Sequence, residues 1–68
     1  MKHLVKTANS TYIIDDSRKE LTRIGDRSWK FTYERLVPVM KGMPLIAISE
    51  GGRVLKTSPV EEIGLAAI

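Results

Sequence analysis

The chain contains no cysteine and a single histidine, His3, among its 68 residues. The missing cysteines exclude disulfides, thiolate zinc sites and cysteine nucleophiles, and one imidazole is too few for a histidine cluster. A serine hydrolase needs a base and an orienting acid beside its serine, and the sequence has no G-x-S-x-G turn. The Gly51-Gly52 pair is not followed by the Lys-Ser/Thr of a phosphate loop. We therefore expect a non-enzymatic protein with no metal and no cofactor.

Long apolar runs are also missing. The first residues lack the apolar run of a signal peptide, and no stretch approaches the ~20 apolar residues of a membrane helix. Hydrophobic content of 43% with 28% charged residues is typical of a globular protein. A chain this short buries only about 60% of its extended-state surface on folding. We expect no membrane contact, a reducing cytoplasm, and stability that comes from apolar packing or from a partner or second copy.

Charge of one sign is not concentrated anywhere. The net charge is +3. Six cations gather in one half of the chain, namely Arg18, Lys19, Arg23, Arg27, Lys30 and Arg35. Five acids are interleaved with them, namely Asp15, Asp16, Glu20, Asp26 and Glu34. A phosphate-binding surface needs clustered, unopposed cations, so this pattern favours a mixed, solvated surface.

Aromatic residues are few, and three of the four follow one another at alternate positions: Trp29, Phe31 and Tyr33. Alternate side chains of a strand point to the same face. The stripe is therefore either the centre of the core or an exposed binding surface, and the shortage of other large side chains favours the core.

Short β-type segments dominate the rest of the chain. Expected strands are residues 4–7, 11–14, 20–24 and 29–36. A capping box at Ser17 and Glu20 allows a rival helix over residues 17–24, but two apolar anchors make that helix marginal. In the favoured hairpin, one register pairs Ile14 with Leu21 and also Asp15 with Glu20, two like charges. A shift by one position removes the repulsion and loses the apolar pair.

The second hairpin spans residues 45–57, with Gly51 and Gly52 as a two-residue turn. That turn pairs Glu50 with Arg53, Ile48 with Leu55 and Ile46 with Thr57. The expected inward face is then Ile46, Ile48 and Leu55, packed against the aromatic stripe. Lys30, Thr32, Glu34 and Leu36 are expected on the outward side of the aromatic strand.

These segments predict an all-β protein: a small, partly open antiparallel barrel of five to six strands. A short C-terminal helix or an extended tail is expected to follow it. The barrel domain is assigned to residues 1–60 and an apolar C-terminal tail to residues 61–68.

Several of these segments also resemble a known group. Asn9-Ser10-Thr11-Tyr12, Trp29, Gly42-x-Pro44-Leu45-Ile46 and Thr57-Ser58-Pro59-Val60 are similar to segments of short all-β accessory proteins of actinobacterial phages. The resemblance implies a small viral protein, either an accessory factor that binds host proteins or a minor structural part. We expect it in the bacterial host cytoplasm, with a host or viral protein as its partner. It assigns no functional residue.

The leading hypothesis is protein–protein contact, by host-protein binding or self-assembly as a homo-oligomer. The partner-binding residues expected are Lys30, Arg35, Leu36, Ile63, Leu65 and Ile68. The alternative is single-stranded nucleic-acid binding, by base stacking beside cations. Its residues would be Arg27, Trp29, Lys30, Phe31, Tyr33 and Arg35. A minor virion structural role is the third hypothesis.

Overall fold

A computed structural model describes residues 2–25 and 27–66. The described residues contain strands and no helix, so no helix among them is long and apolar enough to cross a membrane. The strands are β1 (Lys2–Thr7), β2 (Thr11–Asp15), β3 (Glu20–Ile24), β4 (Trp29–Thr32), β5 (Arg35–Leu36), β6 (Pro44–Ile48) and β7 (Val54–Leu65). The all-β prediction is confirmed, while seven strands replace the expected five to six.

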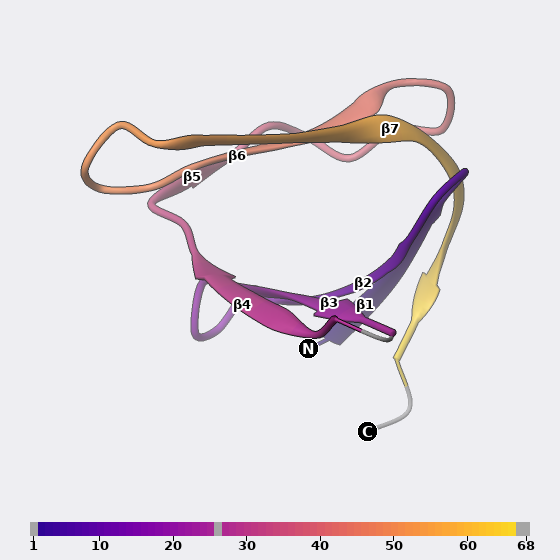
Figure 1. Ribbon diagram of the computed structural model, residues 1–68, viewed down its shortest axis with the longest axis horizontal. Helices are drawn as coiled ribbons and strands as arrows, with labels where there is room; N and C mark the ends of the chain where they lie inside the picture. Colours follow the sequence, from indigo (N-terminus) through magenta and orange to yellow (C-terminus); the bar gives the residue numbers. More distant parts are fainter. Residues whose placement is uncertain (1, 26, 67–68) are drawn as a thin grey trace.

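All seven strands belong to one antiparallel sheet in the order β4-β3-β2-β1-β7-β6-β5. Strand β7 has 12 residues and joins the two halves. Its first half pairs with β6 and its second half with β1, and it bends between them (Figure 1). A bulge in the β1–β7 ladder lies at this bend, because Lys6 faces Glu62 but Thr7 faces Val60. Bulges add local twist, and the sheet curls into a half-barrel.

The core lies inside this curl. The three largest fully buried side chains are Val5, Leu21 and Leu45, and they come from both halves of the sheet. Tyr12, Ile14, Tyr33, Ala47 and Val60 complete the buried cluster, and Phe31, Leu36, Val39 and Leu55 pack against it. Opposed residues of antiparallel strands point to one face, which explains why one row combines Ile14, Leu21 and Phe31.

The first hairpin adopts the apolar register. Ile14 faces Leu21, and Asp15 faces Glu20 despite the like charges. The repulsion is offset locally, because Ser17 Oγ donates a 2.7 Å hydrogen bond to Asp15 and Lys30 Nζ lies 3.7 Å from Glu20. The rival helix over residues 17–24 is therefore wrong.

The expected register of the second hairpin is wrong by one position. Ser49 N–H donates to the Arg53 carbonyl and Gly52 N–H to the Ser49 carbonyl. The loop is thus residues 50–52, a three-residue loop with its left-handed residue at Gly52 (φ +83°). In the resulting register Ala47 faces Leu55 and Ile48 faces Val54. Leu45 and Ala47 point inward, whereas Ile46 and Ile48 lie half-buried on the outer face.

Two further expectations fail. The aromatic strand breaks at Tyr33 and Glu34. Because of this break, Leu36 points inward and packs on the core, although it was expected on the outward side. No C-terminal helix forms in the described part of the chain, because residues 61–65 continue β7 along β1.

Candidate partner-binding groove

The two edge strands of the sheet, β4 and β5, are consecutive in the chain. At the corner between them, Tyr33 N–H donates to the Lys19 carbonyl at 2.9 Å and Glu34 N–H donates to the Ile48 carbonyl at 2.8 Å. These bonds tie the lower and upper halves of the curl together at the corner (Figure 1). Away from it, β4 and the β6–β7 hairpin do not pair with each other. The curl therefore stays open along β4.

A groove of about 500 Å³ occupies this opening. One wall is formed by all four residues of β4, and the other by Ser49, Arg53, Val54 and Leu55 of the hairpin. Successive residues of a strand point to opposite faces, so four consecutive lining residues mean that the groove follows the backbone edge of β4. Its floor includes the half-buried Phe31 and Leu55.

The ladder to β3 decides which backbone groups face the groove. Tyr33 donates its N–H toward the β2–β3 hairpin, at the position opposite Lys19. In antiparallel pairs the hydrogen-bonded positions alternate, so Phe31 and Trp29 also bond to β3. The N–H and C=O groups of Lys30 and Thr32 point the other way, into the groove. They form an unpaired edge of the kind that accepts a further strand.

Trp29 is a half-exposed aromatic platform at the open end of the groove. Its side chain is 37% exposed. The indole packs on the buried Tyr12 ring with centroids 6.0 Å apart and a tilt of 58°. Beside it, Arg23 is held by Ser10 Oγ at 3.0 Å and by the Arg27 carbonyl at 2.9 Å. The platform is thus pre-oriented, which lowers the entropy cost of binding.

The charges lining the groove are positive. Lys30 and Arg53 line it, and no acid does among the residues of its walls. The Lys30 ammonium lies 3.7 Å from the Glu20 carboxylate, yet its side chain remains 56% exposed. The groove therefore combines an apolar floor, a free backbone edge and a cationic rim.

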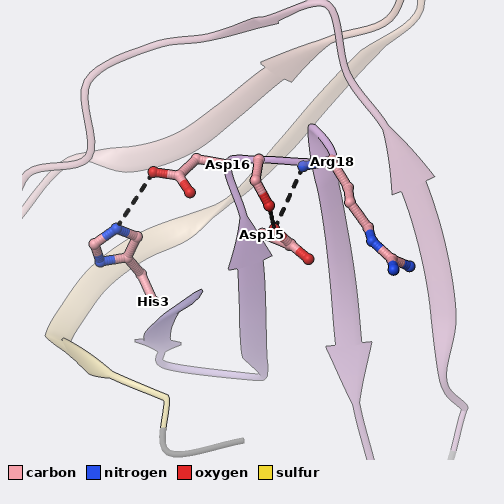
Figure 2. Close-up of polar contacts among 5 residues, drawn as sticks. His3, Asp15, Asp16 and Arg18 are labelled. Atoms are coloured by element: carbon pink, nitrogen blue, oxygen red, sulfur yellow. Dashed lines mark hydrogen bonds and ion pairs between the residues drawn. The ribbon is translucent and has the colours of Figure 1, made fainter. Parts of the chain in front are cut away.

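A second opening lies at the other end of the curl. Its lining is mainly aliphatic, with Val5, Ile14, Leu36, Val39 and Ile63, and its volume is about 300 Å³. At its rim His3 Nε2 lies 3.8 Å from Asp16 Oδ2 (Figure 2). This contact bridges β1 and the β2–β3 turn.

Two titratable groups near that rim have shifted pKa values. Hydrogen bonds from Ser17 Oγ and the Arg18 N–H, with the nearby Lys2, hold the pKa of Asp15 below its usual value (Figure 2). Burial raises the pKa of Tyr33, and the carboxylates of Asp16 and Asp15 raise it further. Within residues 2–25 and 27–66, no three His, Asp or Glu side chains come together as a metal site would require.

The structure divides the residues expected to bind nucleic acid. The aromatic stripe faces the inside of the curl, and the solvent exposure of its side chains increases along it. Tyr33 is buried, Phe31 is half-buried and Trp29 is exposed. Lys30 lines the groove, whereas Arg35 is exposed on β5. Arg27 is exposed in the β3–β4 turn, where its carbonyl holds Arg23.

The residues expected to bind a partner do not form one surface. Lys30 lies on the groove, and Ile63 and Leu65 lie on the last part of β7, exposed by 43% and 69%. Leu36 is half-buried on β5, next to the exposed Arg35. Ile68 lies outside the described residues.

Sequence reasoning missed the hairpin wall of the groove, Ser49, Arg53, Val54 and Leu55. The exposed Val54 follows from the three-residue loop, which the Ser49 hydrogen bonds select. A serine immediately before Glu50-Gly51-Gly52 was the available signal.

We compared the chain with protein-family models, with curated proteins and with solved structures, and none of them matches. The resemblance to phage accessory proteins stays a prediction, and the groove has to be interpreted from its own residues.

Proposed function

We propose that this protein acts by protein–protein contact, taking an extended segment of a partner into the groove as an extra strand beside β4. One observation carries the proposal: the groove follows the free backbone edge of β4, with Trp29, Lys30, Phe31 and Thr32 all lining it. Strand addition supplies main-chain hydrogen bonds for affinity and alternate side-chain pockets for specificity.

The expected gain has two parts. Lys30 and Thr32 offer backbone donors and acceptors, and each net hydrogen bond contributes about 0.5–1.5 kcal/mol. A partner strand also covers the exposed parts of Trp29 and Val54, which are 37% and 63% exposed. Trp29 is already fixed by Tyr12, so little side-chain entropy is lost on binding.

Single-stranded nucleic-acid binding is the second candidate, and the exposed Trp29 beside Lys30 and Arg53 favours it. Two observations weaken it. Tyr33 is buried and Phe31 is half-buried, which leaves Trp29 as the one exposed aromatic ring of the stripe. In addition, Glu20 partly neutralises Lys30. Base stacking uses several exposed rings beside unopposed cations.

Tryptophan emission separates the two candidates, because Trp29 is the only tryptophan. Short peptides that alternate isoleucine with glutamate, serine or lysine are titrated in parallel with poly(dT). We expect a blue shift with at least one peptide as Trp29 becomes buried. Quenching by poly(dT) that recovers with rising salt, without any peptide response, would favour nucleic acid instead.

Thr32→Pro tests the free edge, and Thr32→Val is its matched control. The Thr32 N–H points into the groove, so proline removes a groove donor without removing a bond to β3. We expect Thr32→Pro to weaken peptide binding by about tenfold, the equivalent of one hydrogen bond, and Thr32→Val to leave it unchanged. Equal effects of both variants would show that the backbone edge is not used. Circular dichroism checks that both variants fold.

A further inference from the structure

A second free edge lies at the end of β7. The Ala66 N–H donates to the Lys2 carbonyl at 3.0 Å, and the register from Leu65 to Glu62 along β1 is unbroken. Hydrogen-bonded positions therefore fall at Ala66, Gly64 and Glu62. The backbone groups of Ile63 and Leu65 point away from β1, and in the described part of the chain no strand pairs with them. Both side chains are exposed.

The two free edges match in the facing of their side chains. On β4, Phe31 points to the inside of the curl and Lys30 to the outside. On β7, Ile63 faces Val5 and points inside, while Glu62 faces Lys6 and points outside. In a parallel pair, two neighbouring residues, one on each strand, point their side chains to the same face of the sheet. The backbone of one of these two residues hydrogen-bonds to the other strand of the pair, while the backbone of its neighbour points away from that strand. Setting Lys30 beside Glu62 meets both conditions, because it also sets Phe31 beside Ile63.

The charges match as well. The end of β7 carries the exposed acids Glu61 and Glu62, and the groove rim carries Lys30 and Arg53. Complementary charges of this kind set partner choice and register. The Lys30 ammonium is already close to Glu20, and Arg53 supplies a second cation for the two acids of β7.

We propose that the occupant of the groove is a second copy of this chain, which inserts the free edge of β7 beside β4 in parallel, with Glu62 next to Lys30 and Ile63 next to Phe31. This inference rests on the proposed function of the same groove. Because groove and β7 edge are different surfaces, the contact is head-to-tail. Each added copy leaves one groove and one edge open, so assembly gives a closed ring or a filament.

Charge reversal tests the pairing by light scattering after size exclusion. The wild type should gain mass as concentration rises. Lys30→Glu and Glu62→Lys should each weaken association by about tenfold, from loss of an ion pair and gain of a like-charge contact. An equimolar mixture of the two variants should restore it, because each reversed residue meets its opposite. Lys56→Glu, the same charge change on an exposed residue outside the groove lining, should have no effect.

The outcomes separate the inference from the function on which it rests. If the protein is a monomer at every concentration but Trp29 emission still responds to a peptide, self-association is refuted and peptide binding in the groove is retained. A monomer with no peptide response would overturn both. Assembly that ignores both reversals, or that Lys56→Glu disrupts equally, would also overturn the inference.

Hydrogen exchange of the wild type gives a test that needs no variant. As concentration rises, the amides of Ile63 and Leu65 should become protected together with those of Lys30 and Thr32. Protection of one edge alone would overturn the pairing.

Discussion

The register of the second hairpin decides which side chains of β6 stabilise the protein, and it can be tested by truncation. Leu45 is 1% exposed and belongs to the buried cluster, whereas Ile46 is half-buried on the outer face. Truncating a buried leucine to alanine typically costs about 2–5 kcal/mol, through lost transfer energy and the cavity left behind. Truncating the half-buried isoleucine should cost roughly 1 kcal/mol. We therefore expect Leu45→Ala to be the more damaging by at least about 1 kcal/mol.

The magnitude is large for a protein of this size. At about 0.05–0.15 kcal/mol per residue, 68 residues give a free energy of unfolding of roughly 3–10 kcal/mol. Leu45→Ala could therefore unfold the chain, so Leu45→Val, which removes one methylene for about 0.8 kcal/mol, is measured beside it. Urea unfolding followed by Trp29 emission and by circular dichroism gives the three free energies. If Ile46→Ala costs more than Leu45→Ala, the two-residue turn is correct and the inward face described above is wrong.

Two further perturbations follow from single backbone and side-chain environments. Gly52→Ala should destabilise the fold by about 1 kcal/mol in the same urea assay, because Gly52 has a left-handed φ of +83°. Gly51→Ala is the control and should cost less, because Gly51 has no positive φ and has open space around it. Equal losses of stability in the two variants would contradict the three-residue loop. Burial and the carboxylates of Asp16 and Asp15 raise the pKa of Tyr33, so the folded state keeps its proton after the unfolded chain has lost it. Stability should fall as pH rises above the ordinary tyrosine value of 10.0, Tyr33→Phe should flatten this decline, and an unchanged slope in the variant would show that Tyr33 is not its source.

The register of the first hairpin could be narrowed to two alternatives from the sequence, because an apolar pair and a like-charge pair compete there. Ile14 and Leu21 must both be buried in so small a core, and their burial outweighs the like charges of Asp15 and Glu20. The surroundings then reduce that repulsion, through Ser17 and Lys30.

The second hairpin was misread because two adjacent glycines fit two different turns. A two-residue turn would use positive φ at Gly51 and Gly52, yet only Gly52 adopts it. The choice follows from packing, since the three-residue loop places Leu45 and Ala47 in the core.

Only the β4 wall of the groove could be predicted from the sequence. Trp29, Lys30 and Phe31 stand out in the sequence through their alternation. Arg53 and Val54, on the opposite wall of the groove, do not stand out. Their position opposite β4 depends on the corner at Tyr33 and Glu34, which brings the hairpin to face β4. A break of two residues in a strand pattern is set by long-range closure of the sheet rather than by local preference.

The proposed strand addition requires a β4 edge that is free in the isolated chain and paired when a partner is bound. Residue-resolved hydrogen exchange of dilute protein, alone and with saturating isoleucine–glutamate peptide, tests it most directly. We predict fast exchange for the Lys30 and Thr32 amides alone, strong protection of both in the complex, and protection of Phe31 in either state because it bonds to β3. Protection of Lys30 and Thr32 in the dilute chain, or their unchanged fast exchange in the complex, would contradict the account.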